Sequence, residues 1–333
     1  LYNYLTYLFN YIMKKIILGR TNQKVSKISL GAWSHGRQNT SGESNVGWSN
    51  QTDQDSKNAL LKSYSLGMNH WDTADVYGEG HSEKIIGSTW NEIPRKEIFL
   101  ATKVGWDKGP HKNWYDPNYM KLKIEQSLKN LKTDCVDLLY LHHCNFGKND
   151  EYLDGAIEQI SRFKDEGKTR FIGLSDWSAK RIMKFINHVD PDVVQPLYNV
   201  NDIEYELSGL KNYVKINNLG VCFFSPIKHG ILTGKYDAVP DFPKGDFRKT
   251  VKEFKNIDFI KKMKINREKI EARFSHIKNE AIMHALIGAI LYDNPTGCAL
   301  LGQRNEGQAT SAGRLGKEIS KEDAIWVLSL YRD

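Results

Sequence analysis

Short strand-like runs alternate along the chain with longer segments whose apolar residues recur at every third or fourth position. That second spacing places the apolar residues on one face of a helix, and it is clearest at residues 117–131, 156–167 and 279–293. The strand-like runs cover residues 27–33, 69–72, 98–104, 136–143, 170–176, 192–198, 220–226 and 298–303. Eight strands alternating with helices over about 300 residues predict a (β/α)8 barrel.

The rest of the pattern predicts one domain with no internal linker, covering residues 13–333. Residues 14–27 are expected to form a small β-hairpin ahead of the first barrel strand. Two long segments, 34–52 and 227–257, are expected to be binding loops or lids. A doubly wound dinucleotide-binding sheet is the alternative. It is disfavoured because residues 78–83 place Glu83 where the third glycine of the G-x-G-x-x-G motif belongs.

The first 12 residues are apolar and aromatic and precede Met13. They are too few to span a bilayer, which takes about 20 apolar residues, and they lack the basic start of a signal peptide. We expect translation to start at Met13, so that residues 1–12 form a non-native or disordered extension. The alternative is a small anchor at a membrane surface. No other segment is apolar enough to cross a membrane.

Composition narrows the class of protein. Hydrophobic residues make up 40% and charged residues 26%, as in ordinary globular proteins. The net charge of +7 is modest and spread along the chain, which argues against a nucleic-acid partner but suits a small phosphate-bearing cofactor. The four cysteines form no C-x-x-C pair, so a reducing cytosol is the expected compartment. The oligomeric state cannot be inferred.

Ionisable residues gather where the predicted strands end, and chemistry in a (β/α)8 barrel takes place at that rim. Asp72, Lys103 and His142 end three successive strands, and Tyr77 lies just beyond the first of them. A buried charge needs a partner, and Asp72 with Lys103 is the expected pair. Taken one at a time, Asp72 could be a helix cap, Lys103 a solvated strand end and His142 a core histidine. Their occurrence together at successive strand ends indicates a reaction site. His142 and His143 point to opposite faces, so no metal site is expected.

Several segments resemble the motifs of one known family, the aldo-keto reductase superfamily. WDTADVYGEGHSEKIIG (71–87) resembles its strand-two signature, and ATKVG (101–105) and DLLYLHH (137–143) carry its lysine and histidine. The segments that resemble its later motifs are IGLSDWS (172–178), FFSPIKHGILTGKY (223–236) and LLGQRNEGQ (300–308). The order of motifs looks most like the bacterial and channel-β-subunit members. The resemblance implies a (β/α)8 barrel that binds NADP(H) without a Rossmann domain.

The resemblance also implies a reaction. Hydride passes from the nicotinamide to the carbonyl carbon of an aldehyde or ketone, sugar-derived ones included, and Tyr77 supplies a proton to the oxygen. A free tyrosine has a pKa of about 10, so a neighbouring Lys103 would lower it. Asp72 would hold Lys103 charged, and His142 would orient the carbonyl. The alternative function is a cofactor-sensing regulatory subunit that binds a partner and turns over slowly.

The cofactor contacts are carried over by position. Arg304 is expected to meet the extra phosphate of NADP(H), which NAD(H) lacks. The chain departs from the family pattern at three positions. Asn is more common than Asp176, Asn is more common than Ala312, and Trp or Arg is more common than His143. The implied cofactor-binding residues are Gly31, Ala32, Trp33, Ser175, Asp176, Gln195, Phe224, Ser225, Ile227, Gly230, Gly302, Gln303, Arg304 and Gln308.

Overall fold

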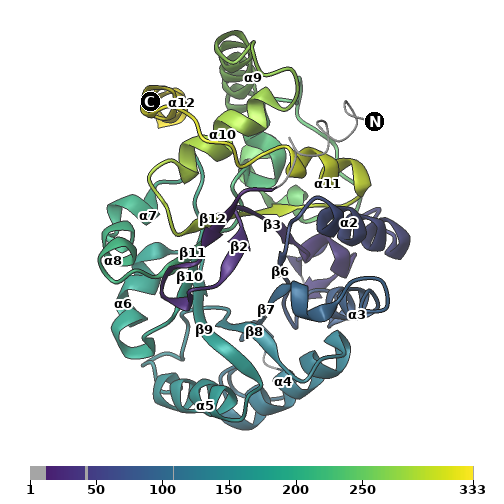
Figure 1. Cartoon of the computed structure of the whole chain (residues 1–333), viewed down its shortest axis with the longest axis vertical. Coiled ribbons are helices and arrows are strands. Elements are labelled where there is room, and N and C mark those ends of the chain that lie inside the picture. Colours follow the sequence, from purple (N-terminus) through teal and green to yellow (C-terminus); the bar gives the residue numbers. More distant parts are fainter. Residues whose placement is uncertain (1–12, 42–43, 108, 333) are drawn as a thin grey trace, which may run out of the picture.

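A computed structural model describes residues 13–41, 44–107 and 109–332, and within them eight parallel strands close into a barrel (Figure 1). The strands follow one another around the barrel in chain order, which confirms the predicted (β/α)8 fold. Each lies within a predicted run or extends it by one residue. They are β3 (Ile28–Gly31), β6 (His70–Asp72), β7 (Phe99–Val104), β8 (Val136–Leu141), β9 (Thr169–Asp176), β10 (Val193–Pro196), β11 (Gly220–Phe223) and β12 (Gly297–Gly302).

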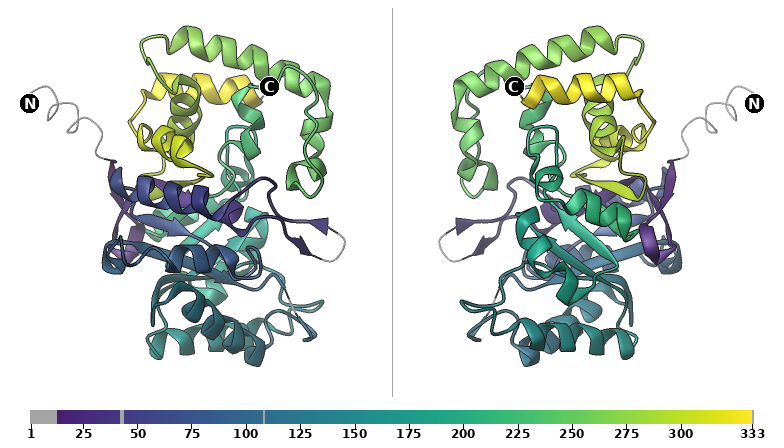
Figure 2. Two further views of the ribbon diagram at one scale, coloured as in Figure 1. Left: turned by 90° about the vertical axis from the view of Figure 1, so that its right-hand side faces the viewer. Right: turned by 90° about the vertical axis from the view of Figure 1, so that its left-hand side faces the viewer.

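Helices surround the barrel, and their ends follow local sequence signals. At α4, the Asp116 carboxylate accepts from the backbone N–H of Asn118 and Tyr119, and Pro117 occupies the first turn. The helices are α2 (Asp53–Ser65), α3 (His81–Gly87), α4 (Pro117–Leu131), α5 (Leu153–Asp165), α6 (Ala179–Val189), α7 (Glu204–Leu207), α8 (Leu210–Ile216), α9 (Ile257–Arg273), α10 (Ala281–Leu291), α11 (Glu306–Gly313) and α12 (Lys321–Arg332). In Figure 2, α9 and α12 lie outside the ring, next to α10.

The predicted N-terminal hairpin is present and closes the amino end of the barrel. Strand β1 (Lys15–Ile17) pairs antiparallel with β2 (Lys24–Ser26), and η1 (Gly19–Thr21) connects them. Leu18 and Val25 are fully buried and pack in one cluster with side chains of the barrel interior. The expectation for residues 1–12 lies outside the described residues.

The two predicted long loops carry short ordered elements and contact each other. The first holds η2 (Trp33–Gly36) and the two-residue strands β4 (Thr40–Ser41) and β5 (Ser44–Asn45); the second holds the 3-10 turns η4 (Lys228–Thr233), η5 (Phe247–Thr250) and η6 (Lys252–Lys255). The Phe247 N–H donates to the Gly47 carbonyl at 2.9 Å, and the Ser49 hydroxyl donates to Asp246 at 2.8 Å. The loops therefore form one continuous wall beside the strand ends.

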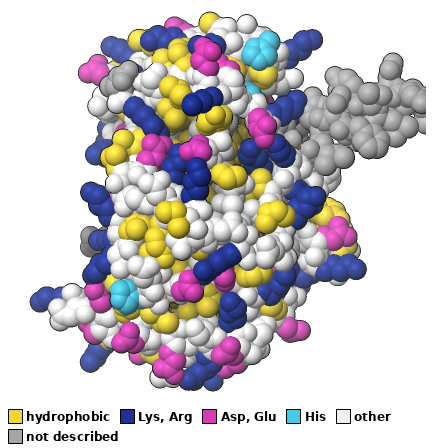
Figure 3. Space-filling model, turned by 60° about the vertical axis from the view of Figure 1, so that its left-hand side comes forward, with side chains coloured by type: hydrophobic (Ala, Val, Ile, Leu, Met, Phe, Trp, Pro, Cys, Tyr) yellow, Lys and Arg dark blue, Asp and Glu magenta, His cyan; other side chains and the backbone are white. Residues whose placement is uncertain are grey.

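The surface carries mixed charges. On the face shown in Figure 3, Lys and Arg side chains are interspersed with Asp and Glu. Within the described part of the chain, no helix combines the length and the apolar character needed to cross a membrane.

Candidate active site

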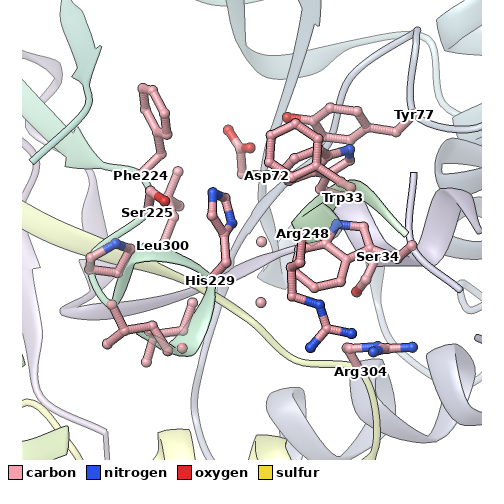
Figure 4. Close-up of a pocket in the computed structure, with 18 of the residues that line it drawn as sticks. Trp33, Ser34, Asp72, Tyr77, Phe224, Ser225, His229, Arg248, Leu300 and Arg304 are labelled. Atoms are coloured by element: carbon pink, nitrogen blue, oxygen red, sulfur yellow. The ribbon is translucent and has the colours of Figure 1, made fainter. Parts of the chain in front are cut away.

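A cavity of about 410 Å3 opens at the carboxyl ends of the barrel strands. Strand ends line one side of it and the two long loops line the other (Figure 4). Three of the predicted site residues, Ala32, Lys103 and Gln303, are buried behind the wall. Fifteen others line the cavity: Gly31, Trp33, Asp72, Tyr77, His142, Ser175, Asp176, Gln195, Phe224, Ser225, Ile227, Gly230, Gly302, Arg304 and Gln308.

Lys103 forms the predicted ion pair with Asp72 at the floor of the cavity. Both side chains are almost fully buried. The ammonium group also donates to the Thr73 carbonyl at 2.8 Å and lies 3.5 Å from the Tyr77 hydroxyl. An ammonium so enclosed needs its charge balanced, and Asp72 balances it. The pair therefore holds a positive charge next to the phenol.

Gln195 adds a contact that the sequence does not reveal. Its amide donates to the second carboxylate oxygen of Asp72 at 2.9 Å. Separately, the Ser175 hydroxyl donates to the backbone carbonyl of Gln195 at 3.1 Å. Because the side-chain amide of Gln195 donates to Asp72, Gln195 supports the ion pair between Asp72 and Lys103. This role is additional to the predicted contact of Gln195 with the cofactor.

The turn after β6 requires its glycine. Gly78 has φ of 63°, and a Cβ at this position would lie 2.1 Å from the Gly36 carbonyl oxygen. Only glycine combines that backbone conformation with so close an approach. The turn projects Tyr77 into the cavity, where its ring meets the His142 ring edge-to-face at 5.9 Å between centroids.

The pKa of Tyr77 is raised overall, which corrects the expectation of a net decrease. Burial is the largest cause and outweighs the opposing effect of Lys103; Asp72 also raises the pKa. The expected influence of Lys103 is therefore real, but it only offsets part of the cost of burial. Burial and the charge of Lys103 hold the pKa of His142 well below its usual value, so its imidazole is neutral.

Aromatic side chains make the cavity wall near Tyr77 largely apolar. Trp33 packs against Phe247 at 4.8 Å and Trp48 at 5.5 Å between ring centroids, and Trp106 lies 5.3 Å from the His142 ring. Trp48, Trp106 and Phe247 were not predicted as site residues. Two of them lie in the two long loops, whose length was the only signal.

Two arginines line the cavity beside Trp48, and their guanidinium groups lie 5.1 Å (Arg248) and 5.6 Å (Arg304) from the centre of its ring. The Arg304 guanidinium donates to the Asn50 carbonyl at 3.1 Å and to the Gln51 side chain at 3.0 Å. Arg248, which was not predicted, forms a bidentate pair with Asp246 with two bonds of 2.8 Å. Burial is the main cause that lowers the pKa of Arg304, and the nearby Arg248 adds to it. The two guanidinium groups bring positive charge to this part of the wall, and an anion would suit it.

The positions that depart from the family pattern have local partners. The Asp176 carboxylate accepts from the backbone N–H of Cys144 and of Ser178, both at 2.8 Å. Burial raises its pKa despite these two bonds. The His143 ring packs against Trp106 at 4.1 Å between centroids, with the two ring planes tilted by 31°, and it lies outside the cavity lining. Burial lowers the pKa of His143 to about 4.

Unpartnered polar atoms show that the cavity suits a polar ligand. Within the described part of the chain, the hydroxyls of Ser34 and Ser225 and Nδ1 of His142 are buried without a hydrogen-bond partner, and all three residues line the cavity. Buried polar groups normally have a partner, and a ligand rich in hydroxyl and phosphate oxygens would supply one. Together with the two arginines, these atoms fit a nucleotide cofactor.

The fold and the site define a (β/α)8 barrel protein with an ionisable cluster at the carboxyl rim. The model of the Aldo/keto reductase family matches residues 27–310, so the chain belongs to this family.

Curated relatives differ in the functions that their names state. The chain is 34% identical over 213 residues to the fission-yeast protein "Aldo-keto reductase yakc [NADP(+)]", a match that covers 62% of each chain. It is 30% identical over 255 residues to an Arabidopsis thaliana "Probable voltage-gated potassium channel subunit beta", covering 72% of this chain and 71% of the relative. It is 29% identical over 246 residues to the Escherichia coli "NADH-specific methylglyoxal reductase", covering 68% and 72%.

Solved structures share the fold. The glycerol dehydrogenase AKR11B4 from Gluconobacter oxydans superposes with a TM-score of 0.76 at 24% identity, covering 95% of this chain and 94% of that one.

Proposed function

We propose that the protein is an NADP(H)-dependent reductase of aldehydes or ketones, with Tyr77 as the proton donor. The observation that carries the proposal is the Tyr77 hydroxyl 3.5 Å from Lys103, inside a cavity that also holds His142. Family membership and the relatives named as reductases support the reaction class.

Each residue of the cluster has a task in this reaction. When bound, NADPH supplies the hydride that reduces the carbonyl carbon. Tyr77 donates its proton to the carbonyl oxygen as negative charge develops there. The Lys103 ammonium stabilises the phenolate that remains, and Asp72 keeps that ammonium in place. A neutral His142 offers one N–H to the same oxygen.

The preference for NADP(H) rests on charge. Arg304 and Arg248 line one end of the cavity, beside Trp48 (Figure 4). The hydroxyls of Ser34 and Ser225, which also line the cavity, have no hydrogen-bond partner among the described residues. We assign this end to the phosphates of the cofactor. The relatives do not decide the question, since one is named for NADP(+) and another for NADH.

The lining favours apolar carbonyl substrates over sugars. The Trp33 ring lies 6.2 Å from the Tyr77 ring and Trp106 lies 5.3 Å from His142, while Trp48 and Phe247 pack against Trp33. All four aromatic side chains line the cavity. A sugar would leave several hydroxyls without partners against these rings, which costs free energy. We therefore propose aromatic or other apolar aldehydes and ketones.

The test is steady-state oxidation of NADPH and NADH with a panel of aromatic aldehydes, aliphatic ketones and sugar aldehydes. The expected result is turnover with NADPH, highest on the apolar aldehydes. The alternative is a cofactor-sensing subunit, favoured by the channel-subunit names among the relatives. Tight NADPH binding without turnover on any carbonyl would support that alternative and contradict the reductase.

A further inference from the structure

Two cysteines and a histidine converge inside the barrel, below the cavity floor. Cys222 on β11 and Cys298 on β12 are in-register partners, and their sulfurs lie 3.3 Å apart. The sulfur of Cys298 lies 3.6 Å from Nδ1 of His70 on β6. The three ligand atoms all lie within 4.8 Å of one another, and all three residues are fully buried.

The cluster forms the layer next to the active site. Side chains two positions apart on a strand share a face, and successive layers of a barrel are built in this way. His70, Cys222 and Cys298 each precede by two positions a residue that lines the cavity, namely Asp72, Phe224 and Leu300. A group bound by the cluster would thus join β6, β11 and β12 directly beneath the active site.

The two distances from the sulfur of Cys298 agree with shared coordination of one cation. Around a tetrahedral Zn2+, with about 2.3 Å to sulfur and about 2.0 Å to nitrogen, two sulfurs lie about 3.8 Å apart and sulfur and nitrogen about 3.5 Å apart. The separations of 3.3 Å and 3.6 Å from the sulfur of Cys298 need changes of only a few tenths of an ångström. The sulfur of Cys222 and Nδ1 of His70 lie within 4.8 Å of each other, so binding also requires one of these side chains to move toward the ion by up to about 1 Å. A disulfide, with a bond of about 2.05 Å, needs the sulfurs to approach by more than 1 Å.

The chemistry of the donors selects the cation. Two thiolates and a neutral imidazole balance a divalent cation, so the loaded site is electrically neutral in a dry interior. Thiolate ligands favour zinc over magnesium or calcium. The Ser29 hydroxyl, 2.9 Å from Nδ1 of His70, is within reach as a fourth, oxygen ligand. The second nitrogen of His70 has no hydrogen-bond partner among the residues that the structure describes, and the His70 ring meets the Phe99 ring edge-on at 5.2 Å.

We propose that His70, Cys222 and Cys298 form a structural site for Zn2+ in the barrel interior. The proposal is independent of the reductase activity and departs from the expectation of no metal, which was drawn only from His142 and His143. Sequence spacing gives no hint of the site, because its three ligands lie far apart along the chain. A site so enclosed fills as the chain folds, and the metal stabilises the folded state.

The experiment measures the metal content of the full chain after expression in zinc-supplemented medium and purification in reducing buffer. About one equivalent of zinc per chain is expected, with loss of the metal in Cys222→Ser and in Cys298→Ser. Cys135→Ser is the matched control and keeps the zinc, because Cys135 lies outside the cluster. Chelation during unfolding and refolding is expected to lower the Tm of the parent.

A second measurement decides the question if the variants fail to fold. Parent protein refolded with Co2+ is expected to show the absorption of thiolate-bound cobalt, and alkylation of Cys222 and Cys298 is expected to be blocked by the bound ion. The proposal would be overturned if the parent protein held no metal after expression in zinc-supplemented medium and also none after refolding with Co2+. Zinc retained by a folded Cys222→Ser/Cys298→Ser double variant, or a disulfide between the two cysteines in the purified protein, would overturn it as well.

Discussion

Gln195 donates a hydrogen bond of 2.9 Å to the carboxylate of Asp72 from the opposite wall of the barrel. Strands β10 and β6, which carry these residues, lie four strands apart in either direction around the barrel. The bond therefore spans the barrel interior. One carboxylate oxygen of Asp72 accepts a hydrogen bond from Lys103 and the other accepts one from Gln195, so both oxygens of this buried group have a partner.

Replacement of Gln195 by Met is expected to lower both stability and activity. Methionine keeps the length of the side chain but leaves one oxygen of Asp72 unpaired. A hydrogen bond to a charged group contributes about 1.5–3 kcal/mol, so urea unfolding is expected to show a loss of this order. Gln303→Met is the matched control, because Gln303 is equally buried and its amide contacts only the sulfur of Met68. Equal unfolding free energies for the two variants would contradict the role given to Gln195.

Arg304→Ala is expected to weaken NADPH binding more than NADH binding. The guanidinium provides charge at the assigned phosphate end and also holds residues 49–51 through their oxygens. Loss of the charge affects only the cofactor that carries the extra phosphate, by about tenfold or more in Kd. Fluorescence titration with both cofactors measures the difference.

Gln51→Ala separates the two roles of Arg304. It removes one of the contacts that anchor the guanidinium and leaves the positive charge in place. We expect it to change the Kd of both cofactors by similar factors. If Arg304→Ala also weakens both cofactors equally, the arginine only anchors the loop and the phosphate assignment is wrong.

Glu83 is expected to make stability fall as pH rises through the neutral range. It is fully buried on α3, where Thr102 donates to one oxygen at 2.7 Å and Asn130 to the other at 3.1 Å. Burial raises its pKa from 4.5 to about 7 despite these bonds. Between these two values the folded state binds more protons than the unfolded state, so unfolding becomes easier as pH increases.

The measurement is urea unfolding from pH 5 to pH 8 for the parent and for Glu83→Gln. The parent is expected to lose stability across this range and to level off above pH 7, where the carboxyl group is ionised in both states. The glutamine variant carries no titrating group at this position, so its profile is expected to be flatter. Parallel profiles for the two proteins would show that Glu83 does not titrate in this range.

Much of the fold could be predicted because local patterns determine it. Each barrel strand is a short buried run between helical segments, and each was located to within a few residues. Asp72, Lys103, Tyr77 and His142 were predicted to cluster because their motifs end neighbouring strands, and the barrel brings those ends to one rim.

The features that were not predicted depend on contacts distant in sequence. Gln195 and Asp72 are 123 positions apart, and no local pattern couples them. Trp48 and Phe247 lie in two loops without periodicity, and these loops contact each other although they are far apart along the chain. The net direction of the Tyr77 pKa was also missed, because the sequence shows the charged neighbours but not the depth of burial.

The proposed acid, Tyr77, is set apart from the other tyrosines in the barrel by its neighbours. Tyr140 is also near Lys103, whose ammonium lies 5.9 Å from the centre of its ring, but Tyr140 is fully buried and does not line the cavity. Tyr77 lines the cavity, and its hydroxyl reaches the ammonium. Among these two phenols, only Tyr77 can meet a substrate.

Tyr77→Phe is expected to lower kcat for carbonyl reduction by about 10²–10⁴-fold, since general acid catalysis typically contributes that much. The ring and its packing against His142 remain, so the Kd for NADPH is expected to stay nearly unchanged. Lys103→Met is expected to cause a similar loss, because the phenolate would form without a balancing charge. The double variant should be little worse than either single one, since the two residues act as a unit. Tyr140→Phe is the matched control and should keep near-parental kcat. A Tyr77→Phe enzyme within a few-fold of the parent would refute the assignment and leave Tyr77 as a packing residue at the turn.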